Sequence, residues 1–106
     1  MKITKCTIAG NICAGNGRTD PEPIAGRGIE LDSYCEGNTV TGNAVSQNTD
    51  YGIWELPKEG EPTHYNDYNA IVANACTQNS YEDQYQVKKI GEHSFEEDNI
   101  KKYQLW

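Results

Sequence analysis

The chain has 106 residues, a formal net charge of −7 and 36% hydrophobic residues. This length fits one domain, so residues 1–106 are expected to fold as a unit. The acidic balance excludes a nucleic-acid surface that tracks phosphates with clustered Lys and Arg, and no apolar run approaches the roughly 18 residues of a membrane-spanning helix. Neither DNA nor an inserted membrane is therefore an expected partner.

Short alternating segments separated by turn formers indicate β-strands along most of the chain. The segment 14–23 is dense in Gly, Asn, Asp and Pro and is predicted to be a loop. Residues 66–77 fit both the helical and the strand period, and Asp67 as a cap together with frequent Ala favours a short helix there. Strands are predicted at 2–9, 27–34, 39–46, 51–56, 85–90 and 101–106.

Six or seven short strands punctuated by turns are typical of a small antiparallel β-sandwich or barrel. We therefore expect a mainly β domain of this kind with at most one short helix. Gly42 lies inside one predicted strand and marks a bulge. No internal repeat is evident in the sequence.

Four cysteines occur in a chain with few large aliphatic residues, namely Cys6, Cys13, Cys35 and Cys76. Their spacings of 7, 22 and 41 residues lack the paired knuckles of a zinc site, so two disulfides are predicted and neither metal nor cofactor is expected. All three pairings stay open, although bridges from the N-terminal strand to the far part of the chain would constrain the unfolded state most. Disulfides imply an oxidising compartment, and hence secretion.

The two histidines, His64 and His93, are the first catalytic candidates. Imidazole titrates near neutral pH, so the two side chains could form a general acid–base pair. Both lie in charged, turn-like surroundings, and the alternative is that they are solvated surface residues.

Residues 62–68 (PTHYNDY) resemble the strand that carries the first catalytic histidine of fungal guanyl-specific ribonucleases. The resemblance implies Glu82 as the base and His93 as the second histidine. It also requires an arginine for the phosphate after His64, and Lys88 is a poorer bidentate partner. An inactive relative fits this pattern better than an active enzyme, because both arginines precede the histidine, at Arg18 and Arg27.

Aromatic residues are the candidate binding residues, because Tyr and Trp anchor many interfaces. They bracket an exposed-looking loop and comprise Tyr51, Trp54, Tyr65 and Tyr68. The alternative for Trp54 is a core anchor in a small β protein. A cluster of acidic residues lacks the spacing of a calcium loop and is expected in a solvated turn, at Glu92, Glu96, Glu97 and Asp98.

The length, the four cysteines, the acidity and the abundance of Asn, Gly, Thr and Tyr resemble the small secreted effector and elicitor proteins of plant-associated fungi. The resemblance implies a monomeric, non-enzymatic, extracellular protein that binds host proteins or a cell-surface component and modulates plant defence. Two alternatives remain: a secreted ribonuclease-like protein, active or inactive, and a secreted inhibitor or antimicrobial toxin.

Overall fold

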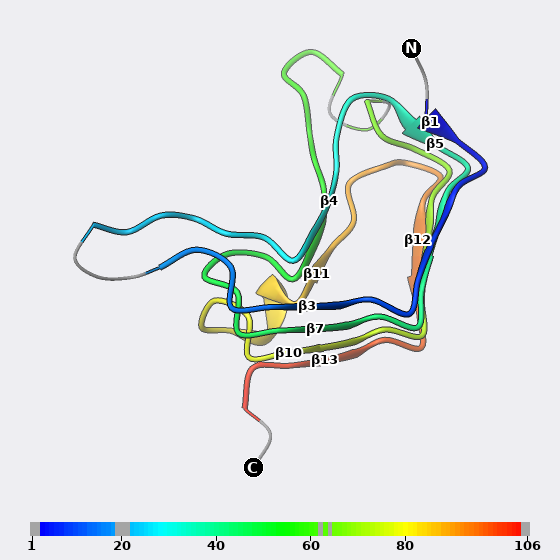
Figure 1. Cartoon of the computed structure of the whole chain (residues 1–106). Coiled ribbons are helices and arrows are strands. Elements are labelled where there is room, and N and C mark those ends of the chain that lie inside the picture. The colour runs from blue at the N-terminus through cyan, green and yellow to red at the C-terminus, as the bar shows by residue number, and fades with distance from the viewer. Residues whose placement is uncertain (1–2, 19–21, 62, 64, 105–106) are drawn as a thin grey trace.

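The computed structural model describes residues 3–18, 22–61, 63 and 65–104 (Figure 1). Its strands are two or three residues long, and each ends at a turn. They are β1 (Ile3–Thr4), β2 (Thr7–Ala9), β3 (Ile12–Ala14), β4 (Ile29–Leu31), β5 (Cys35–Glu36), β6 (Thr39–Thr41), β7 (Ala44–Ser46), β8 (Ile53–Glu55), β9 (Ala70–Val72), β10 (Ala75–Thr77), β11 (Val87–Lys88), β12 (Phe95–Glu97) and β13 (Ile100–Lys102).

All of these strands pair in parallel with strands from neighbouring turns of the chain. The sheets run β13-β10-β7-β3, β12-β9-β6-β2 and β11-β8-β4, with a short β1-β5 pair beside them. The two four-stranded sheets collect one strand from each of four coils, the β11-β8-β4 sheet collects strands from three of them, and the coils stack along one axis (Figure 1). The architecture is therefore a parallel β-helix.

This topology corrects the predicted fold. The chain is mainly β, as expected, but the antiparallel sandwich or barrel is wrong because every strand pair is parallel. The predicted strand 39–46 is two strands that turn at Gly42, whose φ is +67°. Residues 66–77 form β9 and β10 in place of the short helix. Local alternation cannot distinguish these cases, because each strand finds its partner in another coil.

The helical content of the described residues is one 3-10 turn, η1 (Asp83–Tyr85). No helix in these ranges is long and apolar enough to cross a lipid bilayer. The acidic cluster is a solvated turn only in part: Glu92 and Asp98 lie in exposed turns, whereas Glu96 and Glu97 belong to β12, in which Glu96 faces the inside of the coil.

An internal repeat does exist, contrary to the expectation from sequence. Equivalent corner residues lie 32, 31 and 25 positions apart at Asn11, Asn43, Asn74 and Asn99. Each repeat unit is a residue with positive φ, an inward Asn, and a three-residue strand whose middle side chain points inward. The repeat escapes notice because only the Asn and the inward residue must be similar from coil to coil.

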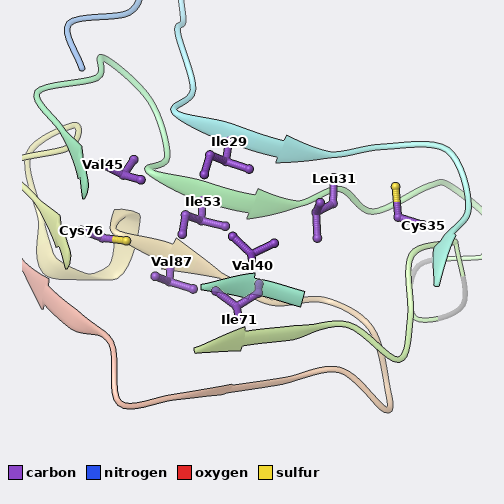
Figure 2. Packing of buried hydrophobic residues seen from close by; sticks show 9 residues of the cluster. All are labelled: Ile29, Leu31, Cys35, Val40, Val45, Ile53, Ile71, Cys76 and Val87. Atoms are coloured by element: carbon purple, nitrogen blue, oxygen red, sulfur yellow. The ribbon is translucent and has the colours of Figure 1, made fainter. Parts of the chain in front are cut away.

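The hydrophobic core is a narrow column inside the coils (Figure 2). The middle residues of successive strands stack in register, for example Val40 on Ile71 and Val45 on Cys76. Side chains no larger than Ile or Leu fill it, and they are Ile29, Leu31, Cys35, Val40, Val45, Ile53, Ile71, Cys76 and Val87.

Buried asparagines join the coils at their corners. The backbone N–H of Asn43 donates to Asn74 Oδ1 at 3.0 Å, and Asn74 Nδ2 donates to the carbonyl of Val40 at 2.9 Å. A second ladder runs from Asn48 to Asn79 at 3.2 Å. Each amide satisfies a backbone group that the turn would otherwise leave buried without a partner.

The predicted disulfides are wrong, because all four cysteines are free. Cys13 and Cys76 point into one core column but are separated by Val45, which places them two coils apart. That spacing is about 9–10 Å, beyond the roughly 7 Å limit for the Cα atoms of a disulfide. Burial raises the pKa of Cys76 to about 12 and also raises that of Cys35, whereas Cys6 is exposed. The argument for an oxidising compartment therefore falls away.

Candidate binding groove

A row of aromatic rings in tilted contact crosses the outside of the second and third coils. Tyr51 lies 4.6 Å from Trp54 and 5.0 Å from Tyr85, and Tyr85 lies 5.1 Å from Tyr81, measured between ring centroids. The structure thus brings together two of the predicted binding residues, Tyr51 and Trp54, and extends them with two tyrosines around η1.

Trp54 is on the outer face of β8, between the buried Ile53 and Glu55. The guanidinium of Arg27 lies 4.5 Å from the Trp54 ring and is held by an ion pair with Asp50 at 2.8 Å. Arg27 and Tyr51 both contact the indole, so protein side chains already cover the Trp54 end of the aromatic row. The tyrosine end of the row is the part that remains open to a ligand.

Tyr81 is the point where three surface hollows meet. Their volumes are about 740, 570 and 390 Å³, and Tyr81 lines each of them. Tyr81 is 63% exposed, so much of its ring is open to solvent at the junction although it contacts the Tyr85 ring. We call this combined surface the Tyr81 groove; it is formed by the corner after β10, by its neighbours in the second and fourth coils, and by Arg18 and residues 23–25 of the first coil.

Neutral polar side chains dominate the 570 Å³ hollow of the groove. Two aromatic rings face it, those of Tyr81 and Tyr103. The other lining residues carry amides or hydroxyls and are Gln47, Asn48, Thr49, Gln78 and Ser80. Gln47 and Gln78 occupy equivalent corners of adjacent coils, each just before an inward Asn, with φ values of 57° and 58°.

The 740 Å³ hollow adds charge to one side of the groove. Glu82, Asp83 and Lys102 line it, and Lys102 Nζ lies 3.9 Å from Asp83. The Tyr81 and Tyr85 hydroxyls are 3.3 Å apart, and this hydrogen bond raises the pKa of Tyr85 to about 12. The Tyr85 phenol therefore stays neutral at physiological pH and can donate or accept a hydrogen bond.

The predicted catalytic residues do not form one site. His64 lies outside the described residues. Glu82 borders the Tyr81 groove beside η1, whereas His93 lies at the opposite corner of the coil, just before β12 (Figure 1). The glutamate–histidine arrangement implied by the ribonuclease resemblance is therefore not assembled.

His93 instead belongs to a local cluster with Asp67 and Tyr68. Its Nδ1 lies 2.8 Å from Asp67 Oδ2, and its ring stacks on Tyr68 at 4.5 Å. The hydrogen bond to Asp67 raises the pKa of His93. Burial would raise the pKa of Asp67, but hydrogen bonds from His93 and Tyr68 outweigh it and lower that pKa. Asp67 also accepts from the His93 N–H, so the cluster ties the start of the fourth coil to the third.

The remaining predicted binding residue, Tyr65, lies in a separate patch. Its ring meets Tyr34 edge to face at 5.0 Å, and Lys58 Nζ lies 5.4 Å from both rings. The four predicted aromatic residues thus fall in three places. Only Tyr51 and Trp54 are neighbours.

Sequence reasoning missed the tyrosines of the groove. Tyr81 and Tyr85 are four residues apart in a polar segment, a spacing that the 3-10 turn converts into a ring contact. The four-residue spacing was the one sequence feature that could have indicated contact between Tyr81 and Tyr85. Nothing local could have joined Tyr103, which comes from the next coil.

In the described part of the chain, no three His, Cys, Asp or Glu side chains converge in a way that could hold a metal ion. Comparisons with protein-family models, curated proteins and solved structures gave no match for this chain.

Proposed function

We propose that this protein binds a neutral oligosaccharide in the Tyr81 groove and does not catalyse a reaction on it. The observation that carries the proposal is the meeting of three hollows at one exposed tyrosine, with amide and hydroxyl side chains around it. A sugar ring has apolar C–H faces, which pack on aromatic rings, and hydroxyls at its edge, which pair with amides and hydroxyls.

The size of the groove suits a ligand of several sugar rings. Each of its hollows falls in or near the range of about 300–1,000 Å³ typical of small-molecule sites. The hollows adjoin at Tyr81, so a chain of rings can occupy more than one while stacking on the tyrosine between them.

Charge favours a neutral ligand over an anionic one. Among the described residues, the charged ones that line the groove are three carboxylates and two cations (Glu82, Asp83, Asp50, Lys102 and Arg18), so it offers no cationic surface, and the chain carries a net charge of −7. A polyanion such as nucleic acid or an acidic glycan would be repelled, whereas an uncharged sugar pays no such electrostatic penalty.

The test is titration of the protein with neutral hexasaccharides of glucose, xylose and mannose, followed by calorimetry. We expect at least one to bind, and Tyr81→Ala to weaken that binding at least tenfold. The matched control is Tyr68→Ala, because Tyr68 is 58% exposed against 63% for Tyr81 but lies at the His93 corner.

Absence of binding to every neutral hexasaccharide would refute the proposal, and so would equal losses in Tyr81→Ala and Tyr68→Ala. Preferential binding of an acidic hexasaccharide of galacturonic acid would refute the charge argument.

A second candidate is the host-protein-binding effector suggested by the overall character of the chain. The observation that favours it is the patch of Tyr34, Tyr65 and Lys58, in which both tyrosines are partly exposed, since tyrosines anchor many protein interfaces. Infiltration of the folded protein into leaf tissue should provoke a defence response that Tyr34→Ala with Tyr65→Ala abolishes. Because the cysteines are free, this candidate no longer has the support of a disulfide framework.

A further inference from the structure

The two ends of the β-helix differ in chemistry. One core column runs Ile8, Val40, Ile71, Glu96, and its neighbour runs Cys13, Val45, Cys76, Lys101. At the fourth coil these inward positions therefore hold a carboxylate and an ammonium, which form an ion pair. At the first coil they hold Ile8 and Cys13, which are apolar and only half-buried.

The first coil also presents strand edges that pair with no other strand of the described ranges. β2 and β3 are the last members of their sheets. The N–H of Thr39 donates to Cys6 and that of Ala44 donates to Asn11, so residues 6, 8, 11 and 13 direct their backbone groups at the second coil. In a parallel ladder the intervening residues direct theirs away from it, and these are Thr7, Ala9, Ile12 and Ala14. Such an edge is a template for another strand.

We propose that two copies of the chain associate head to head through the first coil, around a two-fold axis that passes through the corner between β2 and β3. The sheets of these strands form adjoining sides of the coil (Figure 1). β2 runs toward the corner and β3 away from it, so the axis lays β2 of one copy antiparallel to β3 of the other.

The register of this pairing follows from the chain itself. Residues 7–14 are arranged evenly about the Gly10–Asn11 corner. Thr7 therefore faces Ala14 of the second copy, and Ala9 faces its Ile12. In this register each residue with an outward backbone group lies opposite another such residue. Ile8 then lies against Cys13 of the second copy and closes the core column across the interface.

The charged end explains why the pairing is head to head. A head-to-tail stack would bury the Glu96–Lys101 pair beneath Ile8 and Cys13, and desolvation of a buried ion pair can exceed its Coulombic gain. The symmetric arrangement leaves both charged ends in water. It also closes on itself, so it yields a dimer and no fibre.

The available area is enough for a weak but specific interface. The molecule measures 36 × 29 × 19 Å, and four coils at about 4.8 Å each stack along its short dimension. If the coil covers half of the 36 × 29 Å end, each copy buries about 500 Å² and the pair about 1,000 Å², which reaches the lower bound for specific interfaces.

The experiment is light scattering on the reduced protein from micromolar to millimolar concentration. We expect a mass that rises to twice the 11.8 kDa of the chain and goes no higher. A constant monomer mass would overturn the proposal, and masses growing beyond the dimer would show head-to-tail stacking instead.

Cys13→Lys and Ile8→Lys should each weaken the dimer at least tenfold, because each places an unpaired charge in the interface. Lys101 already occupies the Cys13 column at the other end, so the fold accommodates a lysine there. The control is Ile100→Lys, in which a 57% exposed isoleucine of the last coil changes. An equal effect of the control would refute the assignment to the first coil.

Amide exchange on the unmodified protein gives a second readout that needs no variant. The N–H groups of Thr7, Ala9, Ile12 and Ala14 should be protected at high concentration and lose that protection on dilution. Concentration-dependent protection of the outward Glu96 and Lys101 amides would show that the dimer forms through the fourth coil and would overturn the proposal. Edge amides of the first coil that stay unprotected in the dimer would refute the strand pairing.

Discussion

The asparagine ladders are expected to provide much of the stability of this fold, and Asn74 tests that most directly. Asn74 is 2% exposed. Its Nδ2 donates to Val40 O and Asn99 Oδ1, both at 2.9 Å, and its Oδ1 accepts from the N–H and the Nδ2 of Asn43, both at 3.0 Å. Replacement by alanine removes all four hydrogen bonds and leaves the Asn43 N–H without its acceptor.

The expected cost follows from these contacts. Each lost hydrogen bond contributes about 0.5–1.5 kcal/mol, and a buried donor left without a partner costs about 1–3 kcal/mol. We therefore expect Asn74→Ala to lower the free energy of unfolding by at least about 3 kcal/mol, the lower end of this sum. This is a large share of the roughly 5–15 kcal/mol that holds a typical domain folded.

The matched control is Asn11→Ala, at the same corner of the first coil. Asn11 is exposed, and its Nδ2 donates to Asn43 Oδ1 at 3.1 Å and to Ala9 O at 3.3 Å. Water can replace these bonds, so we expect a loss below about 1 kcal/mol.

The assay is equilibrium unfolding in urea, followed by circular dichroism. Asn74→Ala should lower the midpoint and leave the slope unchanged. Equal shifts for the two variants, or a loss below about 1 kcal/mol for Asn74→Ala, would refute the view that buried ladder amides join the coils.

Glu55 is fully buried and accepts hydrogen bonds from Asn69, Ser94 and the backbone at 90 and 91, so Glu55→Ala should cost about 3 kcal/mol in the same assay; a near-neutral variant would contradict this role. The hydrogen bond to Asp67 raises the pKa of His93. The stability that protonated His93 adds is therefore fully present below the ordinary histidine pKa of about 6.5, and it is lost as pH rises through the raised pKa. The stability of the wild type should therefore fall over that range relative to His93→Ala, and parallel pH profiles would exclude the linkage. Alkylation of the denatured chain without reductant should add four groups, whereas in the native protein Cys6 should react first and Cys76 should not react; fewer than four adducts would indicate a disulfide.

Strand positions were largely predictable from alternation. The predicted segments 27–34, 51–56 and 85–90 contain β4, β8 and β11. The helix predicted at 66–77 failed because Ala70, Val72 and Ala75 suit a helix as well as the outside of a strand. Their strand state is decided by pairing with the second coil.

The disulfides were wrongly predicted for a related reason. A small core and four cysteines favour disulfides on composition alone. Stacked coils instead bury asparagines whose only suitable partners are their own equivalents in the next coil. The same residues seen one at a time are ordinary turn formers.

The candidate site was partly accessible from sequence. Tyr51 and Trp54 were predicted as binding residues and their rings are in contact, but Trp54 is covered by Arg27 on one side. The open part of the surface is Tyr81 with Tyr103, which belong to different coils.

The sequence by itself determined the β character, the positions of most turns and the net charge of −7, because these depend on local alternation, turn chemistry and composition. Only the tertiary structure decided that the strands pair in parallel, that the asparagines point inward and that the groove forms. Each of these depends on stacking residues about one coil apart, and a partner some thirty positions away leaves no mark on the local pattern that a single sequence displays.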